Sequence, residues 1–182
     1  AAAKSAATRM ALVPEDRKGQ GLVLMQSILK NISLANLDRF SGFMTIDADA
    51  EMVAATQQAK SLAVKAPNLG VSVDSLSGGN QQKVVIAKWL ATKPKVIILD
   101  EPTKGIDIGS KAAVHAFMSE LAAEGLSVIM VSSEIPEIIG MADRVIVMRE
   151  GRIVGRFDRE ELTAERLVRA AAGIGAVPGE GA

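Results

Sequence analysis

Two short apolar runs dominate the middle of the chain, at residues 96–99 and, after Ser127, at residues 128–131. Apolar runs without alternation are typical of parallel strands that are buried on both faces. Between them, apolar residues at helical spacing predict a helix from about Gly109 to Ala123, which Gly125 can end. The residues on its apolar face are Val114, Phe117, Met118 and Leu121. Strand, helix and strand in this order predict an α/β fold, with a parallel sheet flanked by helices.

The first half of the chain carries a helical pattern. A short apolar piece, Met10 to Val13, precedes a charged, glycine-containing segment, Glu15 to Gly21, which we expect to be a loop. Ile28, Ile32 and Leu34 indicate one short helix. A second helix is expected from about Asp47, with one apolar face made by Met52, Ala55, Ala59 and Leu62. Ser77 is a good N-cap for a third helix that reaches about Ala91.

The last 50 residues predict a small α and β segment. A short helix is expected at 135–141, and a hairpin at 144–157 that turns at Glu150-Gly151. A final helix should run from about Thr163 to Ala172. We expect residues 174–182 to be a flexible tail, and residues 1–9 to be non-native sequence or a truncation edge.

Composition narrows the possible functions. The 182 residues carry 21 basic and 21 acidic side chains, so no net charge favours nucleic acid or an anionic membrane. Cysteine is absent and His115 is the one histidine, which leaves disulfides, a histidine zinc site and a Ser-His-Asp triad without support. We expect His115 to lie at a helix surface. No apolar run approaches the roughly 18–20 residues of a membrane span, so a soluble cytoplasmic protein is expected.

Two adjacent acids, Asp100 and Glu101, end the first apolar run. Open α/β sheets bind ligands at the carboxyl ends of their parallel strands. Asp100 is therefore a candidate ligand of Mg²⁺, which prefers oxygen, and Glu101 a candidate base that orients or deprotonates water. A strand that simply ends in solvated acids is the alternative.

A small turn, Ser77-Gly78-Gly79, opens the third helix. Its backbone N–H groups and the positive end of the helix form a potential anion site, and glycine lets a phosphate approach the main chain. Taken alone, an ordinary capped helix explains the turn better. Trp89 on the same helix suits core packing better than stacking on adenine. Arg17 and Lys18 are candidates for phosphate or partner contacts, although solvated loop charges are the simpler interpretation.

The two signals together are much more specific. LSGGNQQK at 76–83, then VIILDEPTKGID at 96–107, resembles the signature motif and Walker B segment of an ABC ATPase. The resemblance covers residues 10–173 and implies a partial P-loop NTPase domain, with a helical signature subdomain at 22–91 and a Walker B core part at 92–173. PEDRKGQGL, VSSEIPEI and VMREGRIVG further resemble the second, C-terminal ATPase half of a tandem bacterial sugar importer of the ribose, xylose or galactose type.

The resemblance implies the following roles. The signature residues would contact ATP held mainly by the opposite ATPase half; they are Leu76, Ser77, Gly78, Gly79 and Gln81. Asp100 would hold Mg²⁺, Glu101 would act as the base, and Asp107 would line the interface between the halves. The implied partners are the first ATPase half of the same polypeptide, membrane-spanning permease subunits and, indirectly, a periplasmic or extracellular sugar-binding protein. Nucleic acid is not an expected partner. The implied location is the cytoplasmic face of the membrane, as a peripheral subunit.

The sequence also departs from the family pattern. No G-x-x-x-x-G-K-[ST] phosphate loop occurs in these residues, so we expect a piece that begins after that loop and is inactive by itself. Glu15 stands at the Q-loop position, and Ser133 at the position of the switch histidine. Two alternatives remain open: a non-catalytic interaction module, and a soluble ABC ATPase that is not a transporter.

Overall fold

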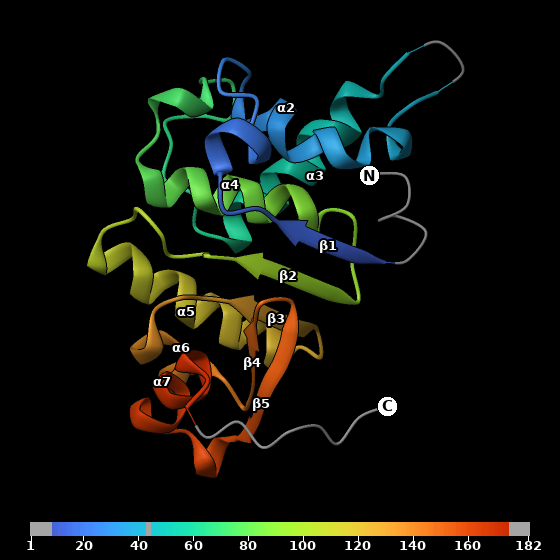
Figure 1. The fold of residues 1–182 in the computed structure, drawn as a ribbon. Coiled ribbons are helices and arrows are strands. Elements are labelled where there is room, and N and C mark those ends of the chain that lie inside the picture. The colour runs from blue at the N-terminus through green and yellow to red at the C-terminus, as the bar shows by residue number, and fades with distance from the viewer. Residues whose placement is uncertain (1–8, 43–44, 175–182) are drawn as a thin grey trace. The chain divides into compact units, whose positions relative to one another are not determined.

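The computed structural model describes residues 9–42 and 45–174. The chain divides into two compact units, residues 1–131 and 132–182, which are drawn in Figure 1. The expectations for residues 1–8 and 175–182 lie outside the described residues.

The first unit contains a three-stranded parallel sheet. Its strands are β1 (Met10–Val13), β2 (Val96–Asp100) and β3 (Ser127–Val131), in the order β1-β2-β3. β2 pairs with both neighbours, so that Ile98 lies beside Leu12 and Ile129. Helix α5 (Ile108–Ala123) connects β2 to β3, packs against β3 and buries Val114, Met118 and Leu121. The predicted α/β fold with a parallel sheet is therefore confirmed.

The expectation that these strands are buried on both faces is wrong for the described chain. Ile97 and Leu99 of β2 are completely buried, whereas Ile98 between them is only partly buried. Ile129 and Val131 of β3 are each 49% exposed. Side chains alternate across a strand, so within this chain only one face of β2 contributes fully to the core.

Helices and short helical turns form the rest of the first unit. They are η1 (Arg17–Gly21), α2 (Ile28–Ser33), η2 (Leu34–Arg39), α3 (Ala48–Ser61), η3 (Val73–Ser75) and α4 (Gly78–Leu90). Residues 17–21, expected to be a loop, form a single helical turn because the Asp16 side chain accepts a hydrogen bond from the backbone N–H of Gly19.

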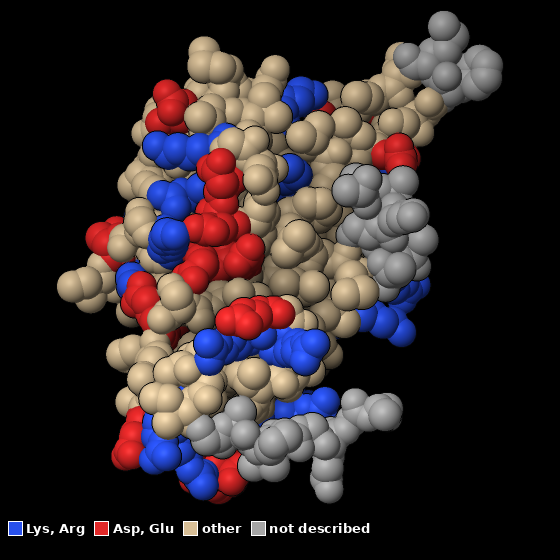
Figure 2. Space-filling model, viewed as in Figure 1, with Lys and Arg blue, Asp and Glu red and all other residues tan. Residues whose placement is uncertain are grey.

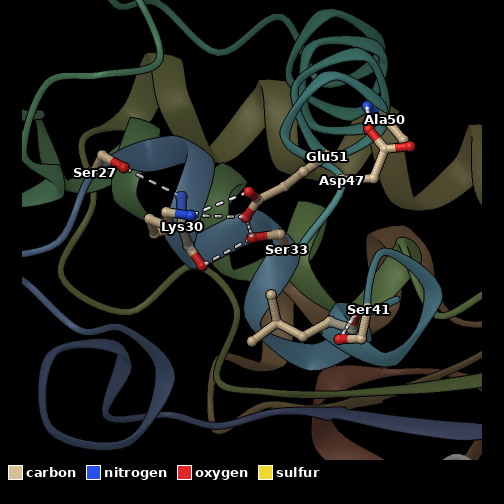
Figure 3. A network of polar contacts seen from close by, with 8 residues as sticks. Ser27, Lys30, Ser33, Ser41, Asp47, Ala50 and Glu51 are labelled. Carbon is tan, nitrogen blue, oxygen red and sulfur yellow. Dashed lines mark hydrogen bonds and ion pairs between the residues drawn. The ribbon is translucent and has the colours of Figure 1, made fainter. Parts of the chain in front are cut away.

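The apolar face of α3 differs from the expected one. Ala55, Ala59 and Leu62 are buried as predicted, but Met52 is 45% exposed and its neighbour Glu51 takes the buried position. A carboxylate is buried there because α2 supplies partners for it. Lys30 Nζ lies 3.0 Å from Glu51 Oε2, and the Ser33 hydroxyl donates to Oε1 (Figure 3).

Helix α4 is the most deeply packed helix of the described first unit. It packs against α2, α3 and β1 (Figure 1), and Val84, Val85, Ile86 and Ala87 are each at most 1% exposed. Trp89 is half-buried near the helix end, and its Nε1 is buried without a hydrogen-bond partner among the described residues. This placement fits the packing role expected for Trp89.

The second unit has the predicted order of elements. These are α6 (Ile135–Met141), β4 (Arg144–Arg149), β5 (Arg152–Asp158), η4 (Arg159–Glu161) and α7 (Ala164–Ala172). Glu150 and Gly151 have positive φ angles of 51° and 75°. Two positive φ angles in a two-residue loop match the right-handed twist of a hairpin. The predicted turn is therefore confirmed.

Candidate functional site

Asp100 and Glu101 lie at the carboxyl end of β2, where the chain turns sharply. Asp100 is the last residue of the strand and is half-buried. Glu101 has a φ of +46°, and its backbone N–H donates to the carbonyl of Val131 over 2.8 Å. A non-glycine residue in this left-handed region costs on the order of 1–3 kcal/mol, and such strain is concentrated at functional sites. The turn gives the two adjacent carboxylates different environments.

The loop that follows β2 is held by the segment after β1. Lys104 forms an ion pair with Glu15, the residue at the Q-loop position. This hydrogen bond to Glu15, together with the charge of its carboxylate, raises the pKa of Lys104. Arg17 donates from one nitrogen to the Lys104 carbonyl over 2.9 Å, and from the other to the Gly105 carbonyl over 3.2 Å. Residues almost 90 positions apart in sequence are thus joined.

The Ser77-Gly78-Gly79 turn begins α4, as predicted. The Ser77 hydroxyl caps the helix by accepting hydrogen bonds from the backbone N–H and the side-chain amide of Asn80. Ser77 is exposed and Gly78 half-buried, whereas Gly79 is buried, so only the very start of this 13-residue helix is accessible. The first N–H groups of a helix have no partners within it and carry a positive partial charge. The turn therefore suits an anion.

Both glycines are closely packed against other elements, and Gly79 leaves no room for a side chain. A Cβ on Gly78 would lie 2.9 Å from a guanidinium nitrogen of Arg17 and 3.5 Å from the Gly105 carbonyl oxygen. A Cβ on Gly79 would lie 2.7 Å from Ser110 Cβ. The signature turn consequently lies directly against the loop that follows the two acids. The structure thus brings together two motifs that are separated in the sequence.

Asp107 has a structural role in this loop. It caps α5: its carboxylate accepts the Ser110 backbone N–H over 2.9 Å and the Ser110 hydroxyl over 2.7 Å. These hydrogen bonds, that of the Ser110 hydroxyl first, lower the pKa of Asp107. The side chain remains exposed, so the position is also available to a partner surface.

Two of the predicted ATP contacts, Gly79 and Gln81, are buried and so less accessible than expected. Gln81 is 3% exposed, and its side-chain amide donates to the Val73 carbonyl inside the unit. Leu76 is half-buried before the turn. The geometry therefore gives Gln81 a supporting place behind the turn, while Ser77 and Gly78 form the accessible part.

Ser133, at the switch position, lies in the second unit, where it is exposed. Its neighbour Ser132 donates a hydrogen bond to the buried Glu137 and accepts one from the backbone N–H of Glu134. These bonds fix the segment that leads into α6. His115 lies in the middle of α5 and is half-buried, at the edge between the exposed surface of the helix and its buried face.

Sequence reasoning missed Ser110, the residue that packs on Gly79, because it lies in an ordinary helix start. The sequence indicates Arg17 only as a candidate for phosphate or partner contacts, not as the residue that connects the two motifs. Nothing in the sequence near either residue indicates its distant partner. The partners become visible only when the chain is folded.

Asp100 and Glu101, at the carboxyl end of β2, suit a magnesium ion that is held partly by water and phosphate rather than by protein ligands alone. Among the described residues, no group of three or more histidine or acidic side chains is placed to hold a metal. Mg²⁺ typically uses one or two carboxylates and completes its shell with water and substrate phosphates. The half-buried carboxylate of Asp100 fits such a role.

Residues 2–104 match the ABC transporter family. The chain therefore belongs to this family, whose cassette has the α/β architecture described above. The chain is 65% identical over 162 residues to "Ribose import ATP-binding protein RbsA 1" of Rhizobium meliloti (strain 1021), a match that covers 89% of this chain and 32% of that protein. It is 52% identical to "Putative ribose/galactose/methyl galactoside import ATP-binding protein 1" of Rhizobium etli, over 92% of this chain and 32% of that protein. The chain thus spans about a third of the length of these curated relatives.

Solved structures agree on the fold. The chain resembles cbiO1 from Clostridium perfringens, part of the ABC transporter complex cbiONQ, with a TM-score of 0.71 and 26% identity, over 89% of this chain and 62% of that one. It also resembles the ATP-binding cassette MJ1267 in its ADP conformation, with a TM-score of 0.75 and 19% identity, over 94% and 71% of the two chains. At that identity the second likeness concerns the fold alone.

Proposed function

We propose that this chain is part of the second, C-terminal ATPase half of a tandem ABC importer that uses ATP hydrolysis to import a monosaccharide. One observation carries the proposal: the signature turn packs directly on the loop that follows Asp100 and Glu101. A phosphate-facing turn and a pair of acids therefore belong to one edge of the first unit. The names of the similar proteins, which are ribose import ATP-binding proteins, supply the sugar class.

In this proposal, each group at the edge has a distinct task. Ser77 and the N–H group of Gly78, the accessible part of the turn, stabilise the γ-phosphate of ATP held by the opposite half. Asp100 would hold Mg²⁺, which neutralises phosphate charge. Glu101 accepts a proton from water as the water oxygen attacks the γ-phosphorus and the bond to the β–γ bridging oxygen breaks. The products are ADP and inorganic phosphate.

The two ATP sites of the whole protein would be unequal. Glu15 stands where a neutral glutamine is usual, and its carboxylate is engaged by Lys104. Ser133 is too short to span the gap that a switch imidazole spans. We propose that this half contributes mainly by donating its signature turn to ATP of the first half, whereas its own Glu101 works in an impaired site.

The helical part, residues 22–91, is proposed to dock on the membrane-spanning permease subunits. Several large apolar side chains of this part are exposed, including Met25 at 85% and Val53 at 69%. A cavity of about 330 Å³ opens among Val23, Gln26, Lys30, Asn31, Leu34 and Leu37. Within the described residues, no helix is both long and apolar enough to span a bilayer. Because this part would dock on the permease, we propose the cytoplasmic face of the membrane as its location, and a sugar-binding protein would act through the permease.

The face drawn in Figure 2 carries basic and acidic side chains intermixed. This mixture follows from the balanced composition, 21 basic against 21 acidic residues. Sequence-independent binding of nucleic acid depends on clustered positive charge. The charge pattern on this face therefore favours the importer over an ABC ATPase that works on nucleic acid.

The test is ATP hydrolysis by the full-length protein assembled with its permease. Ser77→Arg should lower kcat at least about a hundredfold, the loss expected when a phosphate-stabilising contact is removed. Glu101→Gln should lower it less, about tenfold or below, because its own site is already impaired. Ser77 is a better target than Gly79 because Ser77 is exposed, whereas any side chain on Gly79 meets Ser110.

Ser119→Arg, the same change at an exposed position of α5, is the matched control and should leave the rate unchanged. Equal losses from Ser77→Arg and Glu101→Gln would show that both sites hydrolyse ATP. An unaltered rate in Ser77→Arg would refute the proposed function of the turn.

A further inference from the structure

Arg17 occupies the junction of three segments that the proposed function needs. It lies in η1, is half-buried, and donates to the carbonyl oxygens of Lys104 and Gly105 over 2.9 and 3.2 Å. A single planar guanidinium thus holds two consecutive carbonyls of the loop between β2 and α5. Arginine suits this task because its donors are fixed in one plane, whereas the lysine ammonium is a single point charge.

The same guanidinium lies against the signature turn. One terminal nitrogen would be 2.9 Å from a Cβ on Gly78, and both terminal nitrogens would be within 3.9 Å of a Cβ on Gly105. Gly105 has a φ of +67°, a conformation that favours glycine. Gly78 therefore makes room for the guanidinium, while Gly105 contacts it at an ordinary van der Waals distance, so a shift of Arg17 would affect both segments.

Segment η1 is itself anchored at its other end. A Cβ on Gly21 would lie 3.1 Å from Val85 of α4, so the two backbones approach closely. Lys88, buried on α4, donates to the Gly21 carbonyl over 3.0 Å. The ion pair of Lys104 with Glu15 adds a third connection just before η1. With both ends tied, η1 has little freedom, and Arg17 projects from a fixed base.

We propose that Arg17 is a positioning residue for ATP hydrolysis. It fixes the position of the signature turn relative to the loop at 104–107, so that both can contact the ATP of the opposite half at the same time. Arg17 itself need not touch the nucleotide. This inference rests on the proposed function and gives Arg17, which lies within the PEDRKGQGL segment, a defined task at that site.

The experiment measures steady-state ATP hydrolysis by the full-length protein assembled with its permease. The variants are Arg17→Lys, Arg17→Ala, the matched control Arg156→Lys and the signature variant Ser77→Arg. Arg17→Lys keeps the charge but loses the planar pair of donors, so we expect kcat to fall about ten- to a hundredfold, as for other small misplacements of catalytic geometry. KM for ATP should stay within about twofold, because the phosphate loop that binds ATP is elsewhere. Arg156 is exposed, and the same replacement there should have no effect.

Arg17→Ala provides a second readout, because free guanidinium at millimolar concentration can enter the space that the side chain leaves. Partial recovery of kcat in Arg17→Ala, without recovery in Ser77→Arg, is expected if the guanidinium geometry matters. A kcat of Arg17→Lys within about fivefold of the unaltered protein would overturn the inference. If Ser77→Arg also retains full activity, the proposed function fails as well; if Ser77→Arg is inactive, only the role of Arg17 fails.

Discussion

Glu51 shows how one buried charge can be accommodated. Its side chain is almost fully buried, and burial alone would raise its pKa. The hydrogen bond from Ser33 and the bond and charge of Lys30 outweigh that effect, so the pKa lies below its ordinary value (Figure 3). Since these partners lie on α2, the ionised carboxylate joins α2 to α3.

The depressed pKa predicts a dependence of stability on pH. A carboxyl group whose pKa is lowered by folding stabilises the protein above its unfolded value, about 4.3, and loses this effect as pH falls through the folded value. The chain should therefore be more stable than Glu51→Gln at pH 7, and this advantage should shrink between about pH 5 and pH 3. Denaturant unfolding at several pH values measures it. Glu165→Gln, at an exposed ion pair, should show a difference below about 1 kcal/mol at every pH.

The packing of Gly79 predicts a coupled pair of substitutions. Gly79→Ala should destabilise the chain by about 1–3 kcal/mol, because the new methyl group overlaps Ser110. Ser110→Gly removes the obstructing atoms, so the cost of Gly79→Ala should largely disappear in the double variant. Gly140→Ala, also in a helix, meets no atom within 4 Å and should be neutral or stabilising. Full additivity of the pair, measured by denaturant unfolding, would contradict the contact.

At the scale of elements, substitutions in β2 can test whether burial alternates along the strand. Ile97 and Ile98 are the same residue type at adjacent positions, but only Ile97 is completely buried. Ile97→Ala should cost about 2–5 kcal/mol, as expected for a cavity in a packed core, and Ile98→Ala clearly less. The comparison uses the midpoint of denaturant unfolding of this chain. Equal losses would mean that both faces of β2 are packed, as the apolar run alone suggests.

At the scale of the whole molecule, these 182 residues should bind ATP weakly by themselves. They contain the Ser77-Gly78-Gly79 turn but no G-x-x-x-x-G-K-[ST] sequence, whose backbone N–H groups and lysine hold the nucleotide. Calorimetric titration with Mg-ATP should give a Kd weaker than about 1 mM. Micromolar binding, with turnover that Glu101→Gln abolishes, would contradict this prediction.

The sequence alone determined the order and type of most elements. Local signals were sufficient for this: Ser77 as an N-cap, Glu150-Gly151 as a hairpin turn, and helical spacing along α5. Each of these signals depends on residues a few positions apart, so it can be recognised in the sequence directly. The resemblance to the family also came from short contiguous motifs, which the match to residues 2–104 confirmed.

Only the tertiary structure decided which residues meet. The burial of Glu51 in place of Met52 depends on Lys30 and Ser33 from another helix. The partial exposure of Ile98 depends on how much of the sheet is covered, which an apolar run cannot express. Arg17 finds its partners 87 and 88 residues away, beside a glycine that leaves room for it. Contacts over such separations depend on how the sheet and helices pack, and local periodicity holds no information about that packing.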